Sequence, residues 1–182
     1  MIFPVIGNSF YNIISSGEMN MEIERKWLIK TEKVPFDLDS CEKVHIEQAY
    51  VSFSPTIRIR NVDRGRVFLL TVKTKAHGFD PELAKNEYET QITKEEYHQL
   101  MQIVRGNVIS KTRYVRRVND GLIYEIDVFE GEFSGLAYLE IEFQDSATAA
   151  SYPDPEWVER DVTYFPEFKN SALAKYGMPP MR

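Results

Sequence analysis

Charged residues occur two positions apart in seven stretches of this sequence, and each pair carries one sign of charge. The pairs are Glu22/Glu24, Arg58/Arg60, Lys73/Lys75, Glu87/Glu89, Lys111/Arg113, Glu125/Asp127 and Glu140/Glu142. Arginine and lysine side chains bind phosphate oxygens, and arginine does so in a bidentate way. Clustered carboxylates bind hard divalent cations such as Mg²⁺. Together with Lys26, these residue types describe a site for a metal-bound polyphosphate.

This spacing places the charges on one face of each β-strand, because residues two apart in a strand share a face. One interpretation is that the charged faces meet water while the apolar faces form a core. The other is that the charged faces line a closed barrel, with the apolar residues covered by helices or a partner subunit. Burying an unpaired ion costs several kcal/mol. Eight acidic and seven basic residues in these positions, counting Lys26, nearly balance and make a charged interior possible.

Alternation of polar and apolar residues predicts a mostly antiparallel β domain with a few helices. Asp63-Arg64-Gly65 and Asn119-Asp120-Gly121 are typical of hairpin turns. Thr93 begins a capping box, and we expect its helix to end at Gly106. Strands are expected over 21–30, 44–53, 56–62, 66–75, 86–92, 108–118, 122–131 and 136–143, and short helices over 145–151 and 170–176.

The composition limits the classes of partner and compartment. The chain has 182 residues, a net charge of −6 and one cysteine. An acidic chain argues against non-specific nucleic-acid binding, and no apolar run is long enough to predict a transmembrane helix. Cys41 has no partner for an internal disulfide, which is typical of a reducing, cytoplasmic compartment. We expect one domain over 21–182, starting near Met19 or Met21, and an N-terminal extension of unclear role over 1–20 that makes a poor signal peptide.

The charged strands also resemble the CYTH domain family, the triphosphate tunnel metalloenzymes. Glu22-Ile23-Glu24-Arg25-Lys26 matches the ExExK signature that opens these domains. The remaining pattern follows in order as QAYVSF (48–53), TIRIR (56–60), LTVKTK (70–75), NEYET (86–90), KTRY (111–114), YEIDVF (124–129), LEIEF (139–143), DVT (161–163) and NSALA (170–174). The resemblance runs from about residue 21 to 176 and is to the short, single-domain bacterial members.

The resemblance implies a mainly β (α+β) fold, an eight-stranded antiparallel closed β-barrel with a few flanking helices and inward charges. It implies Mg²⁺ or Mn²⁺ as cofactor, held by Glu22, Glu24 and Glu142 with Glu140 as neighbour. The triphosphate would be bound by Lys26, Arg58, Arg60, Lys73, Lys85, Lys111 and Arg113. Glu87, Glu89, Glu125 and Asp127 would orient these bases or bind a second metal. Lys26 and Tyr50 correspond to the residues that help to activate water.

Three features of this sequence differ from the family pattern or stay open. Lys85 replaces the usual arginine, which keeps the charge and loses the fork. Phe165, Pro166 and Glu167 stand where related short members carry an acidic and a basic residue, in a region that can plug one mouth of the tunnel. Lys75 is equally compatible with lining the tunnel and with facing solvent.

We expect a metal-dependent hydrolase of inorganic triphosphate or another compact triphosphate. The alternatives are a class IV-type adenylate cyclase, a thiamine triphosphatase, an enzyme acting on RNA 5′-triphosphate ends, and a non-enzymatic polyphosphate-binding module. A complete metal set beside the basic set favours catalysis. Cations around Lys26 are expected to lower its pKa enough to assist proton removal, an effect that carboxylates nearby would oppose. The expected partner is a small-molecule triphosphate, without nucleic acid or membrane, and a homodimer stays open.

Overall fold

The computed structural model describes residues 19–80, 82–118 and 121–181. Within them, the strands are β1 (Met19–Leu28), β2 (Glu42–Phe53), β3 (Thr56–Val62), β4 (Val67–Lys75), β5 (Ala84–Ile92), β6 (Arg105–Arg117), β7 (Ile123–Phe129), β8 (Ala137–Glu142) and the short β9 (Arg160–Asp161). The α-helices are α1 (Lys94–Met101), α2 (Ser146–Ser151) and α3 (Asn170–Tyr176). Short 3₁₀ turns are η1 (Thr31–Lys33), η2 (Leu38–Ser40), η3 (Gly131–Phe133) and η4 (Pro166–Phe168).

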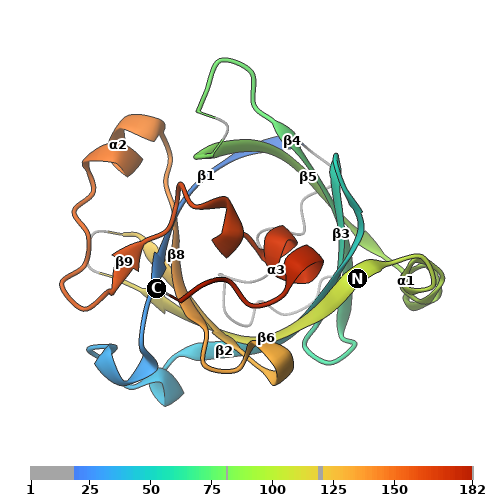
Figure 1. The fold of residues 1–182 in the computed structure, drawn as a ribbon, viewed down its shortest axis with the longest axis horizontal. Helices are drawn as coiled ribbons and strands as arrows, with labels where there is room; N and C mark the ends of the chain where they lie inside the picture. Colours follow the sequence, from blue (N-terminus) through green and yellow to red (C-terminus); the bar gives the residue numbers. More distant parts are fainter. Residues whose placement is uncertain (1–18, 81, 119–120, 182) are drawn as a thin grey trace, which may run out of the picture.

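Strands β1 to β8 close into an antiparallel barrel, as predicted. The pairing follows the order β5-β4-β3-β2-β6-β7-β8-β1, and β1 also pairs with β5. The first half of β1 pairs with β5, from Met19 opposite Tyr88. Its second half pairs with β8, where Glu24 lies opposite Glu142. Strand β9 extends the sheet beside β1, and Figure 1 shows the strands as a ring.

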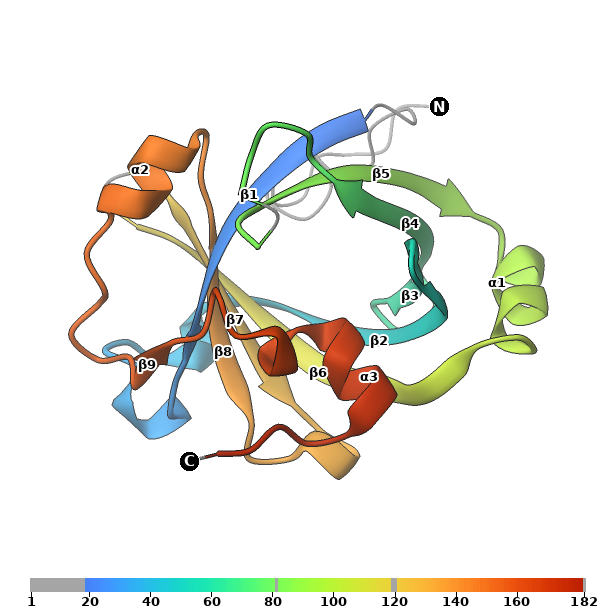
Figure 2. The ribbon, with the colours of Figure 1, turned by 45° about the horizontal axis from the view of Figure 1, so that its top comes forward.

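Helices and loops cover the apolar outer faces of the barrel, so the charged faces turn inward. Ile23, Ile126 and Ile141 are buried in an outer cluster that includes Ala149 of α2. On another side, Ile59 is buried with Tyr97 of α1. Figure 2 shows α1 and α2 on opposite sides of the barrel. Covered apolar faces explain why the interior of the barrel, not its surface, carries the alternating charges.

The turns agree with the sequence where the structure describes them. Asp63, Arg64 and Gly65 all have positive φ angles, as a tight hairpin between β3 and β4 requires. Thr93 caps α1 with the predicted reciprocal capping box. Asn119 and Asp120 lie outside the described residues, although β6 and β7 pair on either side of them. No helix in the described part of the chain is long and apolar enough to cross a bilayer.

Helix α3 lies within the ring of strands in Figure 1 and plugs one end of the barrel. Leu173 and Ala174 of α3 are fully buried beside Phe168, together with the inward-facing Ile109 and Tyr138. The plugged end of the barrel is therefore an apolar core, and the charged residues occupy the remainder. A plug is thus present next to Phe165, Pro166 and Glu167, in the region where the family can form one.

Gly106 does not end α1, which contradicts the sequence prediction. The helix ends at Met101, and Gly106 lies in β6, where the pairing with β2 shifts between Gln48 and Tyr50. Its φ angle is +74°, and a Cβ atom there would lie 2.2 Å from the carbonyl oxygen of Ala174. Glycine is required at this position because it combines a left-handed backbone with the close approach of α3.

We expect Gly106→Ala to lower the free energy of unfolding by about 2 kcal/mol more than Gly135→Ala does. Gly135 has a φ angle of +92°, and a Cβ atom added to it would meet no other atom within 4 Å, so it shares the backbone cost without the collision. Urea denaturation of both variants measures the difference. Equal losses of stability would contradict the close packing of α3 against β6.

Candidate active site in the barrel

A cavity of about 650 Å³ runs through the charged part of the barrel. Its lining includes nine basic and seven acidic side chains, although the whole chain carries a net charge of −6. Low-dielectric walls around such a cavity concentrate the field of the excess cations. The cavity is therefore suited to an anion with several charges.

Most of the residues predicted for the site line this one cavity. They are Glu22, Glu24, Lys26, Tyr50, Arg58, Arg60, Lys73, Lys85, Glu87, Lys111, Arg113, Glu125, Glu140 and Glu142. Lys75 also lines the cavity, at an exposed position near its mouth. Glu89 and Asp127 do not line it; both are buried behind the lining. Glu89 pairs with Arg60, and Asp127 pairs with Lys111 and Arg113, so both contact basic side chains of the lining.

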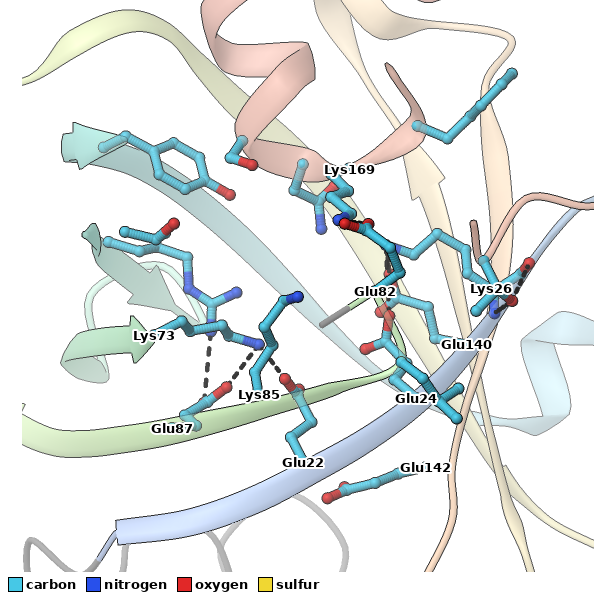
Figure 3. Close-up of a pocket in the computed structure, with 18 of the residues that line it drawn as sticks. Glu22, Glu24, Lys26, Lys73, Glu82, Lys85, Glu87, Glu140, Glu142 and Lys169 are labelled. Carbon is cyan, nitrogen blue, oxygen red and sulfur yellow. Dashed lines mark hydrogen bonds and ion pairs between the residues drawn. The ribbon is translucent and has the colours of Figure 1, made fainter. Parts of the chain in front are cut away.

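Strands β3, β4 and β5 form a wall in which Arg58, Arg60 and Lys73 each have a carboxylate neighbour. Arg60 pairs with the buried Glu89, and Lys73 pairs with Glu22 and with Glu87, the latter at 2.6 Å. Burial opposes ionisation of Glu87, but Lys73 and Arg58 outweigh it and lower its pKa to about 2. Figure 3 shows Lys73 between Glu22 and Glu87. The Glu87 carboxylate is therefore ionised near neutral pH.

Strands β6, β7 and β8 form the opposite wall around Arg113. Its guanidinium donates two hydrogen bonds to Asp127, both 2.7 Å long, and one of 2.6 Å to Glu140. It also pairs with Glu125. Lys111 is only 2 % exposed and pairs with Asp127, which is 0 % exposed. Lys111 therefore belongs to the internal ion network as well as to the lining of the cavity.

Lys26 lies beside carboxylates, which corrects the expectation that cations lower its pKa. Its Nζ is 2.9 Å from Glu140 and 3.4 Å from Glu24. Burial works to lower the pKa of Lys26, but Glu140 and Glu24 outweigh burial and raise that pKa above its ordinary value. The register explains this, because Lys26 lies directly opposite Glu140 in the β1–β8 pair. Without a ligand, Lys26 is therefore an ammonium.

Glu22, Glu24 and Glu142 bring carboxylates together from β1 and β8. Burial first, and then Glu140, raise the pKa of Glu24 to about 8. Glu142 is an exposed residue, yet partial burial of its carboxylate and the charge of Glu22 raise its pKa to about 7. The side-chain carboxylate of Glu142 has no hydrogen bond or ion pair with any described residue. The negative charges of Glu24 and Glu142 are therefore poorly compensated.

Their chemistry fits a hard divalent cation, which binds carboxylate oxygens and relieves the repulsion between them. Within the described residues, no three His, Cys, Asp or Glu side chains already converge on one metal position. The Glu22 carboxylate pairs instead with Lys73, and Glu24 lies near Lys26. Binding a cation would therefore require these side chains to exchange lysine partners for the metal.

Tyr50 lines the cavity near several cations. Its hydroxyl accepts a 2.9 Å hydrogen bond from Gln48 Nε2, and the side chain is 2 % exposed. Burial raises the pKa of Tyr50 and outweighs the cations Arg58 and Lys73, which act to lower it. The phenol is therefore neutral at physiological pH and can donate or accept a hydrogen bond in the cavity.

The mouth of the cavity contains residues that the sequence reasoning missed. They are Glu82 and, next to the plug, Thr163, Lys169, Asn170 and Ser171. Lys169 pairs with Glu82, and Thr163 Oγ1 accepts a 3.0 Å hydrogen bond from the backbone N–H of Lys26. None of these residues belongs to an alternating strand pair. The family matches DVT (161–163) and NSALA (170–174) were the signals that pointed to this part of the chain.

Comparisons with known proteins agree with this geometry. Residues 20–162 match the CYTH domain. The chain is similar to an inorganic triphosphatase of Nitrosomonas europaea, with 34% identity over 84% of this chain and 96% of that protein. It is similar to an inorganic triphosphatase of Acetivibrio thermocellus, with 32% identity over 86% of this chain and 95% of that protein. The solved structure of an inorganic triphosphatase superposes with a TM-score of 0.60, at 31% identity over 84% of this chain and 93% of that chain.

Proposed function

Because this chain belongs to the CYTH domain family, we propose that it is a metal-dependent hydrolase of inorganic triphosphate or another compact triphosphate. The observation that carries this proposal is the cationic cavity inside the barrel, with carboxylates for a metal beside it. The relatives of similar length are inorganic triphosphatases, which supports the same substrate class.

In this proposal, the phosphate chain lies between the two basic walls. Lys26, Arg58, Arg60, Lys73, Lys85, Lys111 and Arg113 supply the positive charge. Arg58 and Arg60 each have a buried Nε–H without a hydrogen-bond partner among the described residues, so protein acceptors do not satisfy either guanidinium completely. Phosphoryl transfer needs mainly positioning and neutralisation of charge on the leaving phosphate, and arginine forks supply both.

Glu22, Glu24 and Glu142 would hold the divalent cation, with Glu140 next to them. Bound there, Mg²⁺ or Mn²⁺ would neutralise phosphate charge and make a water molecule more acidic. Glu24 must be ionised to serve as a ligand, and its raised pKa shows how unfavourable that charge is without a cation. Glu87, Glu89, Glu125 and Asp127 would keep the basic side chains in place.

Lys26 and Tyr50 would orient the attacking water and the phosphate it attacks. Lys26 acts as a cation in this proposal, because Glu140 and Glu24 keep its ammonium protonated. Tyr50 donates a hydrogen bond from its neutral hydroxyl. The small-molecule triphosphate is the only partner proposed; a cytoplasmic location and a homodimer stay predictions.

The test is phosphate release with Mg²⁺ or Mn²⁺ from inorganic triphosphate, ATP, thiamine triphosphate and pyrophosphate, with cyclic AMP assayed in parallel. We expect the fastest release from inorganic triphosphate. Cyclic AMP formed from ATP would identify a cyclase instead. Tight, metal-dependent binding of triphosphate without release from any of these substrates would identify a binding module.

A further inference from the structure

The carboxylate of Glu82 lies inside the mouth of the cavity and pairs with Lys169. Figure 3 shows the two side chains meeting, with Lys169 reaching down from the plug. The side chains are 30% and 35% exposed for Lys169 and Glu82, so a ligand and solvent can reach the pair. Neither residue takes part in the ion networks of the two walls.

The backbone fixes both ends of this pair. Next to Glu82, the carbonyl of Leu83 accepts a 3.3 Å hydrogen bond from the N–H of Glu24, and Leu83 is buried. On the other side, the carbonyl of Lys169 accepts hydrogen bonds from the N–H groups of Ala172 and Leu173, which start α3. The ion pair is therefore built by two anchored segments that lie far apart in the sequence.

The surroundings of Glu82 are cationic. Lys85 also lines this mouth; burial and then the charge of Lys169 lower the pKa of Lys85, while Glu82 acts to raise it. The Glu82 carboxylate therefore forms an ion pair with Lys169 and also acts through its charge on Lys85. An anionic ligand entering the cavity meets the same two ammonium groups and is repelled by the carboxylate.

We propose that Glu82 is an internal competitor of the substrate: its carboxylate occupies Lys169 in the free protein and leaves this lysine when a terminal phosphate of inorganic triphosphate binds there. This inference rests on the proposed function, because it concerns the same cavity and the same substrate class. Only the Glu82 side chain needs to turn away. Lys169 thereby becomes a binding residue for the outer phosphate, and Glu82 sets the affinity for the substrate.

The test is the dissociation constant of inorganic triphosphate, measured by titration calorimetry in EDTA so that no metal-dependent turnover occurs. We expect Glu82→Gln to bind about fivefold more tightly than the wild type, since a partly exposed ion pair is worth up to about 1 kcal/mol. Lys169→Met should bind more weakly, and adding Glu82→Gln to Lys169→Met should change little. Glu159→Gln is the matched control, because Glu159 pairs with Lys30 and Lys33 outside the cavity.

Unchanged or weaker binding by Glu82→Gln would overturn the inference, and so would the absence of triphosphate binding in every protein. A fivefold gain that persists in the Lys169→Met background would also overturn it, because the carboxylate would then act by repulsion without competing for Lys169. Hydrolysis by the wild type is scored separately. A wild type that hydrolyses triphosphate while Glu82→Gln binds no better would refute the competitor and leave the proposed function standing.

Discussion

Replacing Glu24 with glutamine is expected to reduce metal-dependent triphosphate hydrolysis by at least about a hundredfold. Glutamine keeps the size of the side chain and removes the charge that a metal ligand needs. Glu24 lies opposite Glu142 and next to Glu22 on the same face of β1, so the variant loses the central carboxylate of the three. Initial rates of phosphate release with Mg²⁺ or Mn²⁺ measure the effect. The exposed Glu95→Gln on α1 is the matched control.

The same substitution should stabilise the metal-free protein, and the gain should grow with pH. The pKa of Glu24 is raised from 4.5 to about 8 in the folded state. A carboxyl group whose pKa is raised in the folded state lowers the free energy of unfolding as pH rises from 4.5 through 8, because the folded state resists its ionisation. Glutamine does not ionise, so the variant escapes this loss. A folded Glu24→Gln variant that keeps its metal-dependent hydrolysis would contradict the metal assignment. So would an inactive Glu24→Gln variant that is unfolded in EDTA, because it would have lost its fold along with its activity.

Asp127→Asn is expected to lower the free energy of unfolding by about 3 kcal/mol. Asp127 is 0 % exposed, pairs with Lys111 and accepts two 2.7 Å hydrogen bonds from Arg113. Removing its charge leaves two buried cations without their main partner, and an uncompensated buried charge is costly. Urea denaturation measures the loss in the metal-free protein.

Asp39→Asn is the matched control for this variant, because Asp39 pairs with Lys43 on the surface at 3.1 Å. Exposed pairs of this kind contribute about 1 kcal/mol or less. If Asp127→Asn and Asp39→Asn were equally stable, the internal ion network would not be stabilising the barrel. Its charges would then serve the ligand alone.

Alternation along the strands is sufficient to predict which side chains share a face, whereas the inward direction of the charged face was implied by the family resemblance. The period of two residues is a local property, and it assigns Glu22, Glu24 and Lys26 to one face before any partner strand is known. The bounds of β3 and α3 coincide with the predicted ranges 56–62 and 170–176. Turn and capping residues, which are also local signals, flank both elements.

The register between strands is not encoded in that alternation, and the error on Lys26 follows from it. The sequence places Lys26 in the interior but does not say whether a base or an acid stands opposite. The structure places Glu140 there. The prediction that Gly106 ends α1 was wrong for a related reason. Glycine is required at this position because Ala174, a residue of a helix distant in the sequence, approaches it closely.

Contacts across long stretches of chain account for the other surprises. Arg25 belongs to the outward face of β1, yet it is buried and pairs with Asp154 and Asp161 near the C-terminal end of the chain. The pair between Glu82 and Lys169 joins two loops outside any strand pattern. Neither contact leaves a periodic signal in the sequence, so a pattern-based prediction has no means of finding it.

The most direct test of the proposed hydrolase is phosphorus-31 NMR of inorganic triphosphate mixed with the wild-type protein and Mg²⁺. We expect the triphosphate signals to disappear while pyrophosphate and phosphate appear in equal amounts, and EDTA to stop the reaction. Triphosphate that stays intact with Mg²⁺ and with Mn²⁺, in the presence of folded protein, would contradict the proposed function.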